Sequence, residues 1–346
     1  MSLNSLTKLL VIILLPLLFT AVSCNKPTEP PTEDITPGRR DYVWTVDTFR
    51  IPFTILESIW GGSPKDVWTV GGGGDLDKTI YHYNGSEWKT DGISRNINPR
   101  TIWGFSSSDI WIGGANTFWH FNGNSWKEHT NFTIPGFTYC GIEDIWGDTP
   151  NNIYAVGYAR NNDQFMGLVM HYDGMKWQQS KIPMLERYNF DRIRKGENTN
   201  YFMLGIRNEP FAADTMKMYE LANNDLKEIF SGGTTINSGG SFERIGQTMF
   251  FVVNRNICSY SSDNFYPFVK VNEINYGGTF WGRNKNDLFL RMQDGIAHYN
   301  GTDVEYLYNF EYGISISDAM IFEQDIFFLA YDFNNGLNLI IKGMIN

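Results

Sequence analysis

The chain contains a repeated segment whose copies begin at a fixed spacing. The segments IWGGSPKDVWTVG, IWGFSSSDIWIGG and IWGDTPNNIYAVG begin at Ile59, Ile102 and Ile145, each 43 residues after the one before. Each is followed by an apolar run, a turn and a tryptophan, in IYHYNGSEW, FWHFNGNSW and VMHYDGMKW. A period near 40 residues made of short strand-like pieces is typical of a β-propeller. The sequence therefore predicts an all-β fold built from blades.

Each repeat predicts four strands, and the repeats extend to the end of the chain. The second strand of successive units ends near residues 71, 114, 157, 205, 253, 292 and 330. We therefore predict seven four-stranded blades. Six or eight blades remain alternatives, because the units that begin at Ile193 and Phe242 are divergent. The pairs Asn84-Gly85, Asn122-Gly123, Asp173-Gly174 and Asn300-Gly301 predict type I′ turns between the third and fourth strands.

The last unit has a third strand at Leu337–Lys342 and no fourth one. A spare strand, residues 43–49, precedes the first unit. Its Trp44 aligns with Trp88, Trp126 and Trp177 of other fourth strands. We therefore expect the N-terminal strand to complete the last blade, which closes the ring and removes exposed sheet edges.

The first 41 residues have the composition of a targeting signal and a linker. Lys8 precedes an apolar run from Leu9 to Val22, which is short for a membrane span. The run ends in Ala21-Val22-Ser23-Cys24, which resembles a bacterial lipoprotein signal. We expect residues 1–23 to be removed and Cys24 to be lipidated; a plain secretory signal cut near Ser23 is the alternative.

Residues 24–41 form a proline-rich, polar tether, and residues 42–346 form the propeller domain. No aspartate follows Cys24, so the inner-membrane retention signal of enterobacterial lipoproteins is absent. By the same resemblance, we expect an outer-membrane lipoprotein, facing either the periplasm or the cell surface.

Composition and motifs exclude several classes of function. The formal net charge is −10, with no basic run beyond Arg39-Arg40, so a nucleic-acid partner is not expected. No sequence pattern indicates a metal, a cofactor or a catalytic residue set. Cys140 and Cys258 fall in different units; a disulfide between them is open, and two separately buried thiols are favoured.

The repeat accounts for most residues that resemble active-site parts. His82, His120, His171 and His298 share one position in the third strand, which predicts a structural hydrogen-bonding role. The tryptophans also occupy framework positions, and we expect them to fill the space between blades. No tryptophan platform for sugars is expected.

The irregular connections of one face remain as the place for function. In a propeller, the loops after the second and fourth strands emerge on this face, the loop face; the tight turns emerge on the other, the turn face. We predict ligand binding on the loop face, around units two to four. The candidate residues are arginines and tyrosines, which suit carboxylates, sugar hydroxyls and protein hot spots: Arg95, Arg100, Tyr139, Arg160, Tyr188, Arg192, Arg207 and Tyr276.

A charged set precedes the first strand of four units: Glu57, Arg100, Glu143 and Asp191. If these residues ring the mouth of the central channel, we expect them to pair with one another.

The pattern IWG-x-S/T-P-x-D-V-W-x-V-G followed by HY-D/N-G-x-x-W resembles repeats of secreted bacterial β-propellers described as kelch-like or galactose-oxidase-like. With the lipoprotein signal, it resembles a Bacteroidetes-type lipoprotein. We expect a monomeric, non-catalytic binding module for a glycan or an envelope or extracellular protein. The alternatives are a propeller-fold glycosidase, sialidase or polysaccharide lyase, and a structural subunit of an envelope complex.

Overall fold

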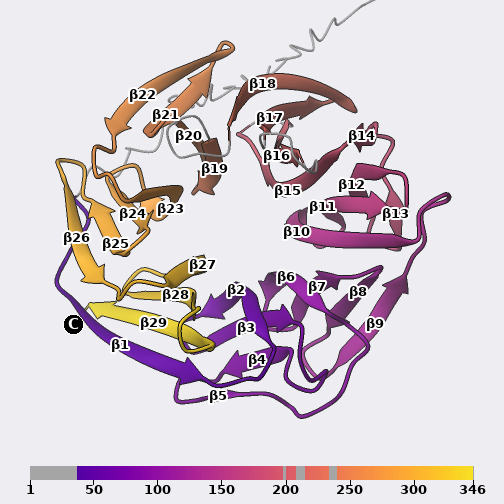
Figure 1. Cartoon of the computed structure of the whole chain (residues 1–346), viewed down its shortest axis with the longest axis horizontal. Coiled ribbons are helices and arrows are strands. Elements are labelled where there is room, and N and C mark those ends of the chain that lie inside the picture. The colour runs from indigo at the N-terminus through magenta and orange to yellow at the C-terminus, as the bar shows by residue number, and fades with distance from the viewer. Residues whose placement is uncertain (1–36, 198–199, 208–214, 234–239, 346) are drawn as a thin grey trace, which may run out of the picture. The chain divides into compact units, whose positions relative to one another are not determined.

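The computed structural model describes residues 37–197, 200–207, 215–233 and 240–345. The chain divides into two compact units, and all described residues belong to the second, which is described by itself. The predictions for the signal, Cys24 and the start of the tether lie outside the described residues. In the described unit, seven antiparallel sheets surround a central channel as a β-propeller, and no helix is present in these ranges (Figure 1).

The four strands of each blade are called a to d from the channel outward. The a strands are β2 (Ile55–Ser63), β6 (Pro99–Ser106), β10 (Tyr139–Thr149), β15 (Tyr188–Lys195), β19 (Gly240–Ile245), β23 (Tyr276–Asn284) and β27 (Ile314–Ile321). The b strands are β3 (Asp66–Gly72), β7 (Asp109–Gly114), β11 (Asn152–Arg160), β16 (Tyr201–Arg207), β20 (Thr248–Val253), β24 (Asp287–Met292) and β28 (Asp325–Asp332).

The c strands are β4 (Ile80–Tyr83), β8 (Thr117–Phe121), β12 (Phe165–Tyr172), β17 (Thr215–Ala222), β21 (Asn256–Ser261), β25 (Gly295–Tyr299) and β29 (Leu337–Ile345). The d strands are β5 (Trp88–Lys89), β9 (Trp126–Asn131), β13 (Trp177–Gln179), β18 (Asp225–Gly233), β22 (Asn264–Lys270), β26 (Val304–Asn309) and β1 (Tyr42–Phe49). A short extra strand, β14 (Leu185–Glu186), pairs with β12.

The N-terminal strand closes the ring as predicted. Strand β1 pairs with β29 along its whole length, from Tyr42 opposite Ile345 to Phe49 opposite Asn338. The Trp44 ring covers Gly343, where an added Cβ would lie 2.8 Å from the indole. The predicted count of seven blades is confirmed, with the outer strand of blade 7 supplied from the other end of the chain (Figure 1).

The c–d turns differ from the predicted type I′ geometry. Gly85 has a φ of 92°, but Asn84 does not have a positive φ. Its side-chain oxygen instead accepts the backbone N–H groups of Ser86 and Glu87, at 3.0 and 3.1 Å. The turn spans four residues, and an asparagine can close such a turn with its own side chain. The type I′ prediction was therefore wrong, although the hairpin itself was placed correctly.

The framework roles of histidine and tryptophan are confirmed. Nε2 of His82 lies 2.7 Å from the Asp66 carboxylate, and that of His120 lies 2.8 Å from Asp109. His171 with Asn152, and His298 with Asp287, repeat the arrangement in blades 3 and 6. Each of these pairs joins strand c to the first residue of strand b, so the histidines hold the sheet together.

Tryptophans pack between blades. The Trp68 ring of blade 1 meets Trp126 of blade 2 edge-on at 5.7 Å, and Trp111 meets Trp177 of blade 3 at the same distance. Cys140 and Cys258 are buried free thiols in blades 3 and 5, as favoured from the sequence. Burial raises the pKa of each thiol to about 11.

The a strands carry a β-bulge near their loop-face end in six blades. The extra residue is Glu57, Arg100, Glu143, Asp191 or Ser317 in blades 1, 2, 3, 4 and 7, while blade 6 has a wider irregularity at residues 277–279. A bulge re-aims a side chain that would otherwise follow the strand alternation. The bulges therefore place a ring of individually chosen side chains around the loop-face end of the channel.

Candidate functional site

The bulge residues of blades 1 to 3 form an ion-pair cluster. The Arg100 guanidinium lies 2.9 Å from Glu143 through Nε and 3.3 Å from Glu57 through Nη2. Its Nε does not satisfy hydrogen-bond geometry, so the contact with Glu143 is an ion pair only. The expected pairing of Arg100 with Glu57 and Glu143 is thus present.

The carboxyl group of Glu143 has a raised pKa. Its carboxylate is 9% exposed, and burial raises its pKa to about 7. Arg100 opposes this rise, whereas the negative charges of Asp191 and Glu57 add to it. One guanidinium shared between two glutamates neutralises only one of them, so near neutral pH the cluster exchanges a proton readily.

Tyr139 and Arg160 face each other across the β10–β11 pair at the loop end of blade 3. The Arg160 guanidinium carbon lies 4.9 Å from the centre of the Tyr139 ring, within cation–π range. Behind them, Tyr158 lies 6.0 Å from Tyr139 and stacks on Phe165 at 4.8 Å. Arg160 is exposed and the three rings are half-buried, so this group offers aromatic and cationic surface to solvent.

Blade 4 carries a second tyrosine–arginine pair. Tyr188 and Arg207 are cross-strand partners at the loop end of β15 and β16. The Lys217 ammonium lies 5.7 Å from the Tyr188 ring, which adds a second cation to this group. The structure therefore brings four of the eight candidate residues into two pairs on adjacent blades.

The other candidates lie elsewhere. Arg95 is 6% exposed and forms a two-point ion pair with Asp91 inside its own connection, which it braces. Arg192 points toward blade 5, where it donates to the Phe242 carbonyl and to Glu243, at 3.2 and 3.1 Å.

Tyr276 is completely buried, so it offers no surface to a ligand. It stands just before the irregularity of its strand, at the register of the core residues Leu56, Ile142 and Phe190. That framework register was not recognised from the sequence.

Sequence reasoning missed Tyr158 and Arg291. Tyr158 is near Arg100 and Glu143, and burial raises the pKa of its phenol to about 12. Arg291 is the only charged residue at its register of strand b; the corresponding residues are Val70, Gly113, Val156, Leu204, Val252 and Leu329. Aligning strand b residue by residue would have found this exception.

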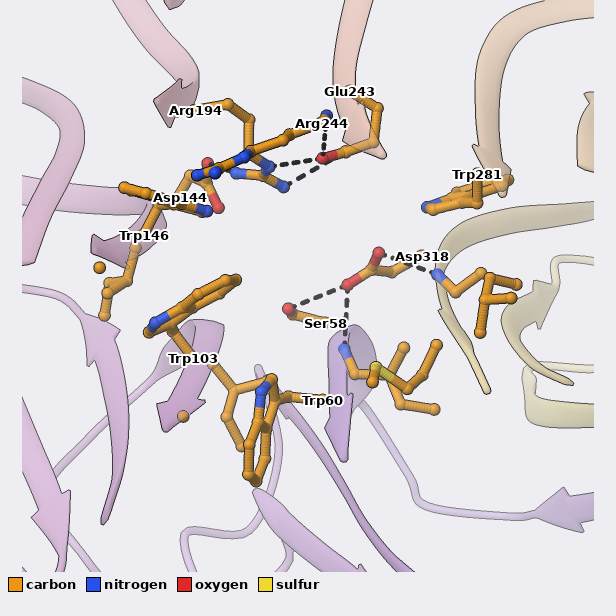
Figure 2. Close-up of a pocket in the computed structure, with 18 of the residues that line it drawn as sticks. Ser58, Trp60, Trp103, Asp144, Trp146, Arg194, Glu243, Arg244, Trp281 and Asp318 are labelled. Atoms are coloured by element: carbon orange, nitrogen blue, oxygen red, sulfur yellow. Dashed lines mark hydrogen bonds and ion pairs between the residues drawn. The ribbon is translucent and has the colours of Figure 1, made fainter. Parts of the chain in front are cut away.

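A cavity with a volume of about 640 Å³ lies in the channel near the a–b turns. Figure 2 shows Arg194, Glu243 and Asp144 gathered on one side and Asp318 bonded toward Ser58. Arg194 bridges Asp144 and Glu243 at 2.6 Å each, and Asp318 accepts the Ile59 N–H at 3.0 Å. These charges are satisfied within the protein and join neighbouring blades, so we assign them to the scaffold.

The described residues form neither a metal-binding cluster nor a membrane-spanning helix. No group of three or more histidine, cysteine, aspartate or glutamate side chains in these ranges is arranged to hold a metal ion. None of their segments forms a helix with the length and hydropathy of a membrane span.

Comparisons with known proteins support the fold. No family model matches the chain, and no curated protein matches it. Similar solved structures include YCF48 bound to D1 peptide, with 13% identity over 88% of this chain and 98% of that chain and a TM-score of 0.60. An inactive virginiamycin B lyase from Staphylococcus aureus with quinupristin has 14% identity over 88% and 100%, and a TM-score of 0.61.

The extracellular domain of a protein assigned as a hybrid two component system from B. thetaiotaomicron is also similar. It has 10% identity and a TM-score of 0.56, and the match covers 86% of this chain and 42% of that chain. At such identities the shared property is the propeller fold, which hosts many unrelated activities.

Proposed function

We propose that the protein is a non-catalytic binding propeller that holds a glycan or an extracytoplasmic protein on its loop face. The observation that carries this proposal is the pair of tyrosine–arginine groups, Tyr139 with Arg160 and Tyr188 with Arg207, on adjacent blades. Tyrosine and arginine combine large contact area with hydrogen-bond donors, and they dominate binding hot spots. Among the described residues, the Arg160 side chain is exposed and can contact a ligand beside the half-buried Tyr139 ring.

The distribution of exposed apolar side chains supports the same face. Phe53 and Tyr312 are 89% and 93% exposed, and Phe53 has a φ of 61°. A positive φ is strained for a bulky residue, and such strain is concentrated at functional sites. The other large exposed apolar residues of the loop face are Ile55, Leu76, Ile93, Ile274 and Phe333, whereas the turn face has Met175. These side chains add apolar contact area to the loop face.

The described end of the tether lies on the turn face, opposite the proposed binding surface. Arg40 is fixed at the turn face of blade 6, where it pairs with Asp303 and Glu305 at 2.8 Å each. The Gly38 N–H donates to the Asn286 carbonyl in the a–b turn at 3.1 Å, so this end of the tether does not cover the loop face. We propose that Cys24 is lipidated and anchors the protein in the outer membrane.

A glycan array and an envelope pull-down with the full-length chain test this function. Y139A and R160A are expected to weaken binding of the captured ligand at least tenfold, and K176A, which removes an exposed charge from the turn face of the same blade, serves as control. Unchanged affinity in both loop-face variants would refute the proposed surface. Binding of YCF48 to a peptide shows that a propeller of this size can hold such a ligand, without extending that ligand to this chain.

The alternative, a propeller-fold carbohydrate-active enzyme, is favoured by one observation. Glu143, with its pKa raised to about 7, shares Arg100 with Glu57 at the channel mouth, and glycosidic acid–base chemistry requires a pair of carboxyl groups of which one holds a proton. Turnover of an array ligand that disappears in E143Q would establish the alternative. Stable binding without product would favour the binding module.

A further inference from the structure

A second cavity lies at the loop-face end of the channel between blades 4, 5, 6 and 7, with a volume of about 280 Å³. Leu204 and Val252 form apolar parts of its wall. Its polar lining comes from Asp191, Arg192, Ser241, Thr279, Arg291 and Ser317. The volume equals that of about nine liquid water molecules, which accommodates a single sugar ring.

Arg291 reaches this cavity because two features of blade 6 break the repeat together. The other blades have valine, leucine or glycine at this register of strand b, where the side chain packs between blades. Opposite Arg291, the widened irregularity contains Gly277 and Gly278. A Cβ on Gly277 would lie 2.9 Å from Arg291 Nε, so the glycine makes room for the arginine side chain.

The Arg291 guanidinium has no carboxylate partner. Nη2 donates to the Gly277 carbonyl at 2.8 Å, and Nη1 makes a long contact of 3.5 Å with the Ile316 carbonyl. A guanidinium has five N–H donors, so three remain without an acceptor among the described residues. Burial and the nearby positive charge of Arg192 hold the pKa of Arg291 below its usual range. A partly buried cation beside another cation is costly unless an anion completes the site.

The remaining groups of the cavity indicate which anion. Arg192 is paired with Glu243, whereas Arg291 forms no ion pair among the described residues and is offset only by the negative charge of Asp191 nearby. Its guanidinium is therefore the group of the cavity that is open to an anion. Asp191 and the Thr279 hydroxyl can bond to sugar hydroxyls. The Ser241 hydroxyl donates to the Gly278 carbonyl at 2.6 Å and the Ser317 hydroxyl to the Leu329 carbonyl at 3.3 Å, so both can still accept from a ligand. The Asp191 carboxylate beside these hydroxyls suits a polyhydroxylated ligand that bears a single negative charge. A simple phosphate carries more negative charge and lacks the ring hydroxyls that could donate to Asp191.

We propose that this cavity binds the carboxylate of an acidic sugar, a uronate or a sialate, with Arg291 as the carboxylate-binding residue. The inference rests on the proposed binding function and specifies its ligand class. The carboxylate accepts two N–H groups of Arg291, and the sugar hydroxyls contact Asp191 and the serine and threonine hydroxyls. No bond is made or broken in this role.

Calorimetric titration of the full-length chain with D-glucuronate, D-galacturonate and N-acetylneuraminate tests the proposal. We expect one of these acids to bind at least tenfold more tightly than D-glucose, acetate or phosphate. R291L places at this position the residue that blades 4 and 7 have there; it should fold with an unchanged or raised Tm and lose at least tenfold in affinity. R291K keeps the charge without the planar fork and should give an intermediate loss.

The proposal is overturned if no acidic sugar binds, if acetate or phosphate binds equally well, or if N-acetylated dipeptides compete as strongly as the sugars. It is also overturned if R291L retains affinity, or if R291L and R291K both unfold the protein, because Arg291 would then be a structural residue. An array ligand that depends on Tyr139 and Arg160 while all acidic sugars fail would leave the proposed function intact and refute this inference alone.

Discussion

Substituting Glu143 with glutamine should make the protein more stable, and the gain should depend on pH. In the folded protein the pKa of Glu143 is raised from 4.5 to about 7, mainly by burial. Below pH 4.5 the folded and unfolded chains both hold the proton. Between pH 4.5 and 7 the unfolded chain releases it first, so rising pH favours the unfolded state and stability is lost.

The size of this effect follows from the change in pKa. A rise from 4.5 to about 7 corresponds to about 3 kcal/mol at about 1.4 kcal/mol per pKa unit. Glutamine resembles the protonated glutamate and carries no such cost. E143Q should therefore match the natural chain near pH 4 and exceed its free energy of unfolding by up to about 3 kcal/mol at pH 8.

Urea unfolding of both chains from pH 4 to 8 measures this difference, and effects of other titrating groups largely cancel in it. E128Q, which changes an exposed glutamate on β9, is the control and should give no pH-dependent difference. A difference between E143Q and the natural chain that stays flat over this range would refute the argument. It would mean that Arg100 keeps Glu143 ionised in the fold.

Three further predictions concern the scaffold. D287A should cost about 3 kcal/mol or more in free energy of unfolding, because it removes the carboxylate that pairs with buried His298 and with Arg283. D109A removes the partner of His120, which is partly exposed, and should therefore cost less in the same urea assay. W44A should cost about 3 kcal/mol by loosening the ring closure, while V43A on the same strand should change thermal unfolding little. Cys140 and Cys258 should react with iodoacetamide only after denaturation, and Tm should be the same with and without reductant; fast labelling of the native chain would contradict their burial.

The architecture was predictable because the repeat encodes it several times. The aligned tryptophans Trp44, Trp88, Trp126 and Trp177 located the fourth strand of four blades, including the one from the N-terminus. The histidine register likewise predicted a bonding role that Asp66 and Asp109 complete. Averaging over copies suppresses the local ambiguity that makes a single short strand hard to assign.

The site was less predictable, because it depends on where the repeat is broken. Tyr276 and Tyr139 both begin an a strand in their blades, but Tyr276 stands at the core register and Tyr139 lies beyond it. A shift of one residue changes the face on which a strand side chain lies, and the sequence does not mark the shift. Arg291 was overlooked although it lies in a part of strand b that pairs regularly with strand c. Only its residue type differs from the valine, leucine or glycine that the other blades have at this position.

The bulges at the loop-face end of the a strands have a consequence for how such a protein can change. Each bulge residue lies outside the paired ladder, so its side chain can be exchanged while the hydrogen bonds on either side persist. Glu57, Arg100, Glu143, Asp191 and Ser317 show that the position accepts acids, a base and a hydroxyl on one scaffold. Single substitutions at the rim of the channel can therefore change its charge and its ligand preference without rebuilding a blade, although a change at Glu57, Arg100 or Glu143 also alters the ion pairs that these three residues share.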